Sequence, residues 1–476
     1  MDAVEARELV AKFYNQRSQV FLDFEDEVGY NFWFLENFRL FFLLTSKASN
    51  LEGKSKAKPK SLKILKSEFK IFLDECFRKS DSVAKTLFYV NRRIISQSSD
   101  IPFELNKREG LQICLNRELT TARINHIDST SSSSSSDSVF LSYLISLSWV
   151  FDLVRYHNAI NRAIQLVDQT IQEDWERKIW ETVKRAGKGN FLICHLRFCA
   201  FNRFFSRNEV CRIILTDENS PQQKVIQYAA RRNSVTTYAV QHGNIARQSP
   251  AYMFGEYEKK PIFPDKTFLW GEEFRELLIE HGGYKAQELE VTGRIEAYIT
   301  PPSTKEEKTI LFASQPIKDE ALRERYIQDV FQAFVQNVEG YTLIIRPHPM
   351  ELDENIFHAF ASDAGVLRYQ VDRDTPLFEQ MANCKALIVA FSTVGAEFLQ
   401  FNKPMIVLDY NNEDLMGWIR AGLGVQVLSK SQLVESINSL NAMQKVENRT
   451  KQIQRLFYFN DNQGLRRILD SIGIEE

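Results

Sequence analysis

The sequence TLIIRPHP at residues 342–349 is followed by CKALIVAFSTVGAEFL at 384–399 and by KPMIVLDY at 403–410. Each stretch contains a short apolar run that ends in small, polar or proline residues. Runs of this kind are typical of buried parallel strands that lead into loops. Because open α/β sheets bind ligands at the carboxyl ends of their strands, these loops are the candidate site.

Arg346 and His348 stand at the end of the first of these runs, and a proline lies on each side of His348. Proline fixes the backbone angle φ, so the guanidinium and the imidazole are held stiffly at a strand end. Two groups that can carry positive charge suit an anion. The sequence therefore predicts an anion site at residues 346–348.

Ser392 and Thr393 leave the next strand, at residues 386–390, and a helix is predicted from Val394. Hydroxyls and unpaired backbone N–H groups then meet at the positive end of the helix dipole. This arrangement predicts a phosphate-binding site.

The composition restricts the class of protein. With 476 residues, the chain is too long for one hydrophobic core, so two domains are expected. The net charge of -2 gives no overall attraction for nucleic acid, and no nucleic-acid motif is present. Six scattered cysteines without a Cys-x-x-Cys pair argue against a disulfide framework and a zinc site, and favour a reducing cytoplasm. No apolar signal core and no run of about 18 apolar residues is present, so neither export nor a membrane span is expected.

Three features of the first 140 residues carry predictions about surfaces. Aromatic residues crowd residues 30–42, where a helix packed on the N-terminal core is favoured over a surface resting on the inner leaflet of the membrane. Seven lysines lie within Lys54–Lys70, where a solvated loop is favoured over contact with anionic lipid or polysaccharide. The serine-rich run 129–138 is predicted to be a surface loop.

The remaining chain predicts α/β architecture. Apolar residues step by three or four from Ile160 to Val183, which predicts one long helix. Strands are predicted in the first half at 191–194, 212–215 and 236–240. Residues 250–300 are predicted to form the crossing between the halves, with short strands at 268–271 and 289–293. Strands are predicted in the second half at 310–313, 342–345, 367–371, 386–390 and 405–408, with helices between them. The predicted division is an N-terminal domain at 1–260, a C-terminal domain at 261–445, and C-terminal helices at 446–476 that brace the first domain.

The first domain supplies candidate catalytic residues. Asp217 and Glu218 follow the strand at 212–215, and His242 follows the strand at 236–240. His242 titrates near neutral pH and precedes a glycine, so it is a candidate general base for an acceptor hydroxyl. A histidine bonded internally to a neighbouring loop is the alternative for His242, and helix capping is the alternative for Asp217.

No metal site is predicted. Asp372-Arg373-Asp374 resembles a metal-binding Asp-x-Asp pattern, but the central arginine disfavours a cation, so a solvated strand-to-helix turn is expected. Gly422 and Gly424 are predicted to form a turn before a strand at Val425, because no strand-to-helix unit surrounds them.

Several short motifs occur in the order found in one family: QHG at 241–243, FLWGE at 268–272, VTGR at 291–294, RPHP at 346–349, FSTVGAEFL at 391–399 and KPMIVLD at 403–409. In this succession the chain resembles GT-B glycosyltransferases of bacterial surface polysaccharides. The nearest groups are the Kdo transferases of capsule and lipopolysaccharide O-antigen, the polysialyltransferases, and the teichoic acid glycerophosphotransferases. The resemblance covers about residues 190–470 and implies two Rossmann-like domains facing across a cleft, after a mostly helical N-terminal extension.

The resemblance also implies roles for residues. His348, Ser392 and Thr393 would contact the donor phosphate, and Glu397 would hold the ribose hydroxyls. The teichoic acid enzymes use a histidine before glycine as base, which matches His242. The sialyl- and Kdo-transferring relatives use an acidic residue there, which leaves Asp217 or Glu218 as the second choice.

The implied activity is a metal-independent transfer of a sugar from a nucleotide donor, with a CMP-sugar such as CMP-Kdo favoured, onto a polysaccharide or glycolipid. Arg346, Arg294 and the phosphate contacts would stabilise the leaving group without a cofactor. A CDP-polyol phosphotransferase, a UDP-sugar 2-epimerase and a non-enzymatic glycan-binding protein are the alternatives. A cytoplasmic protein, peripheral on the inner face of the membrane through the Lys54–Lys70 region, is expected.

Overall fold

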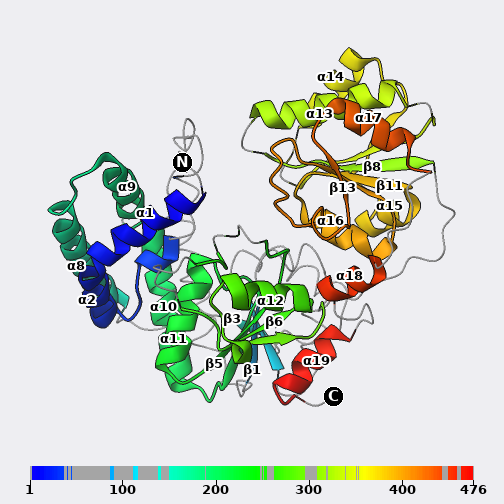
Figure 1. Ribbon diagram of the computed structural model, residues 1–476. Helices are drawn as coiled ribbons and strands as arrows, with labels where there is room; N and C mark the ends of the chain where they lie inside the picture. The colour runs from blue at the N-terminus through cyan, green and yellow to red at the C-terminus, as the bar shows by residue number, and fades with distance from the viewer. Residues whose placement is uncertain are drawn as a thin grey trace.

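The computed structural model describes residues 3–36, 40, 44, 86–90, 111–115, 138–140, 149–187, 189–246, 249, 251–254, 262–294, 308–317, 320–337, 339–349, 351, 353–441, 449–457 and 463–474. Lys54–Lys70, most of the serine-rich run, and Phe38, Phe41 and Phe42 lie outside these residues. The described part is an α/β protein with two parallel sheets and a group of N-terminal helices (Figure 1).

The first sheet has seven strands in the order β3-β2-β1-β4-β5-β6-β7, and every neighbouring pair is parallel. Its strands are β1 (Thr86–Val90), β2 (Leu111–Leu115), β3 (Ser138–Phe140), β4 (Arg212–Leu215), β5 (Thr236–Val240), β6 (Lys266–Leu269) and β7 (Leu289–Val291). The helices between its later strands are α11 (Pro221–Arg232) and α12 (Glu272–His281), and a 3-10 turn, η3 (Ala286–Glu288), precedes β7. The strands predicted at 212–215 and 236–240 are confirmed.

The predicted domain boundary at 260/261 falls inside this first sheet. Residues 238–240 of β5 pair with residues 266–268 of β6, and β6 in turn pairs with β7. Backbone hydrogen bonds therefore hold residues 266–291 in the first domain, and the chain changes sheets between β7 and β8.

The second sheet has six parallel strands in the order β10-β9-β8-β11-β12-β13. Its strands are β8 (Thr309–Ala313), β9 (Thr342–Arg346), β10 (Tyr369–Val371), β11 (Ala386–Val389), β12 (Met405–Leu408) and β13 (Val425–Val427). Its helices are α13 (Glu320–Val335), α14 (Asn355–Ala364), α15 (Leu377–Asn383), α16 (Thr393–Phe398), η4 (Leu399–Phe401) and α17 (Lys430–Asn438). The order of elements predicted for this half is confirmed.

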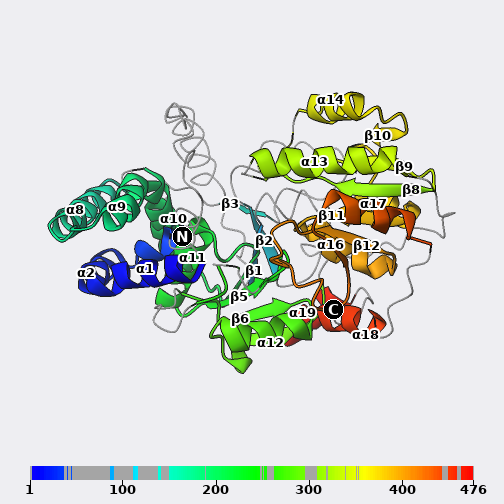
Figure 2. The ribbon, with the colours of Figure 1, turned by 45° about the horizontal axis from the view of Figure 1, so that its top comes forward.

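Both faces of the second sheet are covered, which explains why its strands are continuously apolar. In β8, Ile310 and Phe312 join one buried cluster, whereas Leu311 and Ala313 join another. Alternate side chains of a strand point to opposite faces, so helices cover each face. In Figure 2, α13 and α17 lie on one side of this sheet and α16 on the other.

One of these clusters joins the two domains. It contains Leu311 and Leu387 from the second sheet, Trp270 and Phe274 from the first domain, and Phe457 near the chain end. The domains therefore share a continuous apolar core at their junction.

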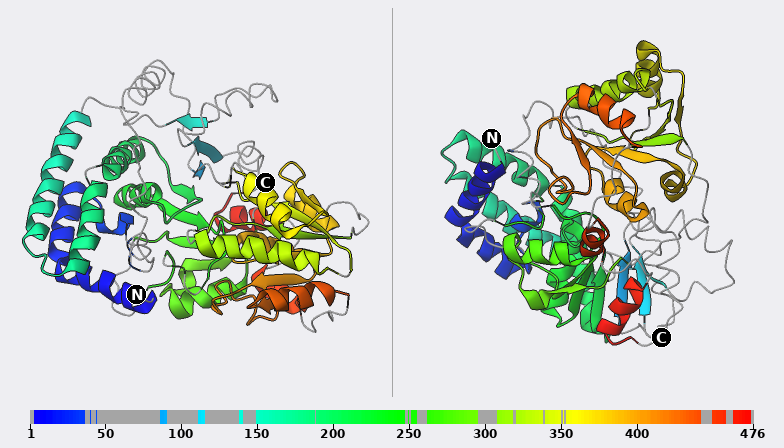
Figure 3. Two further views of the ribbon diagram at one scale, coloured as in Figure 1. Left: turned by 90° about the horizontal axis from the view of Figure 1, so that it is seen from above. Right: turned by 45° about the vertical axis from the view of Figure 1, so that its right-hand side comes forward.

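The N-terminal helices are α1 (Ala3–Gln16), α2 (Ser18–Val28), α8 (Trp149–Asp168), α9 (Asp174–Gly187) and α10 (Asn190–Arg207). Figure 3 shows α1, α2, α8 and α9 grouped at one end of the molecule. The aromatic residues at 30–34 are buried in their core, and Trp33 stacks on Phe13 at 5.2 Å. For these residues the packed-core interpretation is correct. Among the described helices, none has the length and apolarity required to cross a membrane.

Two predictions in this region are wrong. The helix predicted across Ile160–Val183 is two helices, because the Glu176 carboxylate accepts hydrogen bonds from the N–H groups of Gln172 and Glu173 and so starts α9 anew. The strand predicted at 191–194 is the first turn of α10. The apolar positions buried along α10 are three or four residues apart: Phe191, Cys194, Phe198, Phe201 and Phe205.

The C-terminal helices α18 (Arg449–Leu456) and α19 (Gly464–Ser471) lie against the first domain (Figure 1). Arg455 pairs with Glu273 of α12 at 3.0 Å, and Ser471 donates to Glu290 of β7 at 2.8 Å. The end of the chain thus returns from the second sheet to the first.

Candidate active site at the junction of the two sheets

The loops after β4 and β5 bring together the three predicted catalytic residues. His242 Nε2 lies 3.7 Å from Asp217 Oδ1, and His242 Nδ1 lies 3.8 Å from Glu218 Oε2. These distances exceed hydrogen-bond length but lie within ion-pair range. The two candidates for the base are therefore one cluster, in which each imidazole nitrogen faces a carboxylate.

Burial distinguishes the two carboxylates of this cluster. Glu218 has a side chain that is 3% exposed, whereas that of Asp217 is 25% exposed. Tyr252 donates its hydroxyl to Glu218 Oε1 at 2.7 Å, and burial raises the pKa of the Glu218 carboxyl above its ordinary value. Glu218 is thus a fixed group behind the imidazole, and Asp217 faces solvent more openly.

Gln241 holds the loop that carries His242. Its side-chain oxygen accepts the Trp270 backbone N–H at 2.9 Å, its own carbonyl accepts the Trp270 indole N–H at 2.9 Å, and its amide donates to the Gly243 carbonyl at 2.9 Å. Gln241 is buried. Sequence analysis assigned no role to this glutamine, although it is part of the QHG motif.

In the second domain, Glu351 holds the loop that contains His348. Its carboxylate accepts the backbone N–H of His348 at 2.9 Å, the hydroxyl of Ser314 at 3.1 Å, and two N–H groups of Arg323 at 3.0 and 2.8 Å. His348 itself is half-buried. Sequence analysis missed Glu351 and Ser314, although Ser314 follows β8 at the same sheet edge.

Arg346 does not extend as a free anion-binding group. One of its N–H groups donates to the Thr375 carbonyl at 2.7 Å, and burial lowers the pKa of its guanidinium. The physical reason is that β9 and β10 are neighbours, so the turn after β10 lies within reach of Arg346. This guanidinium fixes the turn at 372–375.

Ser392 is the N-cap of α16. Its hydroxyl oxygen accepts the Val394 N–H at 3.3 Å, and the side chain is buried. Thr393 is the first residue of α16. Gln315, which follows β8, accepts the Phe391 N–H at 2.9 Å and so ties two strand ends together.

The loops at 346–348 and 391–393 do not adjoin, because β8 lies between β9 and β11. Neighbouring strands are about 4.8 Å apart, so roughly 10 Å separates the two strand ends. Ser314 and Gln315 occupy the interval, and each of them bonds to one of the two sides. The sequence predicted that both loops lie at one edge of the sheet. It did not predict that Ser314 and Gln315 lie between them and bond to the two sides.

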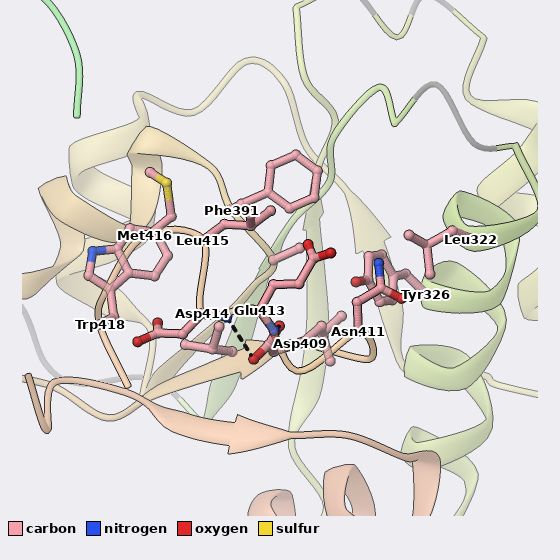
Figure 4. Close-up of a pocket in the computed structure, with 13 residues that line it drawn as sticks. Leu322, Tyr326, Phe391, Asp409, Asn411, Glu413, Asp414, Leu415, Met416 and Trp418 are labelled. Atoms are coloured by element: carbon pink, nitrogen blue, oxygen red, sulfur yellow. Dashed lines mark hydrogen bonds between the residues drawn. The ribbon is translucent and has the colours of Figure 1, made fainter. Parts of the chain in front are cut away.

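A small hollow opens beside the ends of β11 and β12 (Figure 4). We call it the β11–β12 pocket. It is lined by apolar, aromatic and acidic side chains: Leu322, Tyr326, Ala390, Phe391, Val407, Leu408, Asp409, Asn411, Glu413, Asp414, Leu415, Met416 and Trp418. His348 and Ser392 are not among these lining residues.

Two contacts cross from the first domain to the second. Asn244, two residues after His242, approaches Met416 of the pocket with its Nδ2 at 3.6 Å from the sulfur. Arg294, which follows β7, places Nη2 3.5 Å from Glu397 Oε1 of α16 and lies over the Trp270 ring at 4.7 Å. The His242 loop and the β11–β12 pocket therefore adjoin.

The Asp372-Arg373-Asp374 segment forms the turn expected from the sequence. Asp372 accepts the N–H groups of Asp374 and Thr375 at 3.0 Å, and Arg373 pairs with Glu354. Gly422, with φ of 67°, lies in the turn predicted before β13. In the described part of the chain, no three His, Cys, Asp or Glu side chains are grouped so that they could hold a metal ion.

No protein-family model and no curated protein sequence matches this chain. Among solved structures, a putative UDP-N-acetylglucosamine 2-epimerase from Listeria monocytogenes is similar with a TM-score of 0.51 at 14% identity, over 82% of this chain and 96% of its own. A second UDP-N-acetylglucosamine 2-epimerase gives 0.52 at 12% identity, over 83% and 98%. The UDP-GlcNAc 2-epimerase of Methanocaldococcus jannaschii gives 0.50 at 10% identity, over 81% and 99%. These proteins have the GT-B fold, so the predicted fold class is confirmed.

Proposed function

We propose that this protein is a glycosyltransferase that moves a sugar from a nucleotide donor to a glycan or glycolipid hydroxyl. The observation that carries the proposal is the contact between Asn244 and Met416, which brings the His242 loop against the β11–β12 pocket. A candidate base next to a hollow at a sheet edge is what group transfer from a bound donor requires.

In the proposed reaction, His242 accepts the proton of the acceptor hydroxyl. The acceptor oxygen forms a bond to the anomeric carbon of the sugar, and the bond from that carbon to the donor phosphate oxygen breaks. Glu218, held by Tyr252, orients the imidazole, in the way that a buried carboxylate supports a catalytic histidine. Asp217 is the second candidate for the base, because it is the more exposed carboxylate.

The leaving nucleotide gains negative charge as the sugar bond breaks. We propose that the loops at His348 and at Ser392–Thr393 receive it, and that Arg294 and Glu397 serve the phosphate and the ribose. Arg294 and Glu397 meet across the domains at 3.5 Å, and this proximity is the reason for assigning them to one donor. We expect no metal or other cofactor to be needed, since fixed donors supply the charge.

The motif succession favours CMP-Kdo as the donor, a bacterial capsule or lipopolysaccharide as the product, and a cytoplasmic site of action at the inner face of the membrane. These finer assignments rest on the sequence motifs. A CDP-polyol phosphotransferase is the alternative that the Gln-His-Gly motif favours.

A UDP-sugar 2-epimerase is the second candidate, because the solved structures at TM-scores of 0.50 to 0.52 are named as such enzymes. An epimerase converts UDP-N-acetylglucosamine without an acceptor, whereas a transferase requires one. Incubation of the purified protein with this donor alone, followed by separation of the two epimers, distinguishes them.

The first experiment is a thermal-shift screen with CMP, CDP, UMP, UDP and GDP, because a ligand that binds only the folded state raises the melting temperature. A raised melting temperature with one nucleotide supports the proposal and names the base. No shift with any of them contradicts it. Product mass then separates sugar transfer from polyol-phosphate transfer.

Metal independence has its own test. Treatment with EDTA is expected to leave the transfer rate unchanged, because fixed protein donors stabilise the leaving group. A rate that disappears with EDTA and returns only with Mg²⁺ or Mn²⁺ would show that a cation is required.

A further inference from the structure

The charged residues that line the β11–β12 pocket are all acidic. Three of its lining residues are carboxylates, Asp409, Glu413 and Asp414, and none of its lining residues is a lysine, arginine or histidine. Figure 4 shows these acidic side chains together with Tyr326, Phe391 and Trp418 around one hollow. The pocket thus combines aromatic surface with negative charge.

Local hydrogen bonds hold two of these carboxylates in place. Asp409 accepts N–H groups from Glu413 at 2.9 Å, Asp414 at 3.1 Å and Gln426 at 2.7 Å. Asp414 accepts the N–H groups of Ile419 and Arg420 and pairs with the Arg420 guanidinium at 3.2 Å. The Arg420 side chain is 60% exposed, so solvent weakens its compensation of the pocket.

The negative field reaches the aromatic wall of the pocket. Burial, together with the charges of Asp409 and Glu413, raises the pKa of the Tyr326 hydroxyl to about 12 against opposing effects of Tyr410 and Arg325. Glu413 is exposed and lines the open side. A ligand entering the pocket therefore meets lining residues with more negative than positive charge.

The position of the pocket indicates which part of the donor occupies it. In the proposed reaction, the transferred sugar must lie nearest the base, since the acceptor oxygen attacks its anomeric carbon. Met416 lines the pocket and contacts Asn244 of the His242 loop at 3.6 Å. The pocket therefore adjoins the loop that carries the candidate base.

We propose, on the basis of the proposed transferase function, that the β11–β12 pocket holds the transferred sugar and selects sugars without a carboxylate. Hydroxyl groups donate to Glu413 and Asp409, and the apolar face of the ring packs on the aromatic wall. A carboxylated sugar, such as Kdo, a sialic acid or a uronic acid, finds no cation and is repelled. The pocket thus opposes the acidic donor that the sequence motifs favour.

The test compares donors that differ only in the carboxylate. For a uridine nucleotide the pair is UDP-glucose and UDP-glucuronate, and for guanosine it is GDP-mannose and GDP-mannuronate. Calorimetric titration of the full chain is expected to give about tenfold weaker binding of each carboxylated sugar nucleotide than of its uncharged counterpart, because like charges a few ångströms apart repel.

The variant Glu413→Lys places a cation in the pocket. It keeps the hydrogen bond from the backbone N–H of residue 413 to Asp409, because that bond does not involve the side chain. Glu413→Lys is expected to narrow or reverse the difference in affinity between the carboxylated donor and its counterpart. Glu413→Gln is expected to narrow this difference in affinity less. Glu435→Lys, at an exposed position of α17, is the matched control and should leave the ratio of the two donor affinities unchanged.

The outcomes separate the two proposals. If no bare nucleotide binds, the transferase proposal fails, and the sugar preference fails with it. If a nucleotide binds but the carboxylated donor binds as tightly as the uncharged one, only the sugar preference is overturned. If the preference is present but Glu413→Lys leaves it unchanged, the pocket is not its cause and the inference is likewise overturned.

Discussion

His242 lies in a loop that neighbouring residues hold in place. Gln241 fixes the loop to Trp270, and Tyr252 fixes Glu218 behind the imidazole. The residues of the cluster come from two adjacent strand ends, which is why the strand-end rule was sufficient to predict them. The supporting residues Gln241 and Tyr252 could not be predicted, because their roles depend on contacts with residues 29 and 34 positions away.

The substitution His242→Ala tests the proposed base. We expect transfer to fall at least about 10²-fold, because proton removal by a positioned base contributes a factor of this order. Nucleotide affinity should stay near normal, since His242 belongs to the opposite domain. Steady-state rates and calorimetric titration measure the two effects.

A matched control for this variant is His358→Ala on α14, where Nδ1 of the exposed imidazole lies 2.8 Å from the Tyr369 hydroxyl. It should transfer at the normal rate. Full activity of His242→Ala would transfer the role of base to Asp217.

Glu218→Gln tests the burial of this carboxyl group through the pH dependence of stability. Burial raises the pKa of Glu218 above 4.5, so the folded state keeps this proton to a higher pH than the unfolded state. The contribution to stability is complete below the ordinary value and is lost as the pH rises through the folded pKa. Glutamine cannot ionise, so the variant should gain stability relative to the original chain as the pH increases.

Urea unfolding of both proteins at several pH values between about 4 and 8 measures the difference in the free energy of unfolding. A difference that does not change with pH, or that moves in the opposite direction, would show that burial does not raise the pKa of the Glu218 carboxyl.

At the scale of the elements, strands were predicted best where both sheet faces are covered. Residues 405–408 and 386–390 are uninterrupted apolar runs, and β12 and β11 begin at Met405 and Ala386. The run at 191–194 has the same texture but belongs to α10, since a run of four apolar residues does not distinguish a strand from a helix. Only the longer spacing from Phe191 to Phe205 resolves it.

The domain boundary was misplaced for a different reason. A sequence shows strands but not their partners, and the pairing of β6 with β5 is a long-range contact. Residues 250–300 therefore resembled a crossing between domains, while backbone hydrogen bonds assign β6 and β7 to the first sheet.

The junction of α8 and α9 depends on Glu176, which pairs with Arg17 at 2.7 Å while both side chains are buried. Burial pulls the pKa of Glu176 upward, but hydrogen bonds from Gln172, Arg17 and Glu173 outweigh it and lower that pKa. Glu176→Gln is expected to cost about 3 kcal/mol at neutral pH, because it leaves a buried guanidinium without its charged partner. Chemical denaturation measures this loss.

The acid dependence of the same variant has a defined sign. The stabilisation from Glu176 is complete above the ordinary pKa and is lost as the pH falls through the lowered folded pKa, so the deficit of the variant should shrink in acid. The control is Glu181→Gln on the same helix, where a half-exposed carboxylate pairs with Lys184, and it should cost less than about 1 kcal/mol. Equal losses in the two variants would contradict the assignment.

At the scale of the whole molecule, three connections among the described residues join the two domains. They are the shared apolar cluster, the contact of Arg294 with Glu397, and the C-terminal helices that return to the first domain. Trp270 takes part in two of them, because its ring lies under Arg294 and stacks on Phe457 at 6.0 Å. The candidate site thus depends on the end of the chain, although none of its proposed residues lies there.

Gly271 tests that dependence. It follows β6, and a Cβ atom at this position would fall on the carbonyl oxygens of Arg455 and Leu456 in α18. Because these are backbone atoms, no side-chain rotation relieves the overlap, and α18 must move away. Gly271→Ala is therefore expected to lower the free energy of unfolding by roughly 1–3 kcal/mol and to reduce amide-exchange protection in 449–457. Since Phe457 supports Trp270, protection near Arg294 should fall as well.

Gly189→Ala, whose Cβ would make only an ordinary contact of 3.6 Å, is the control and should leave both regions protected. Unchanged exchange in α18 of the Gly271 variant would show that the C-terminal helices do not need this close approach to hold the junction.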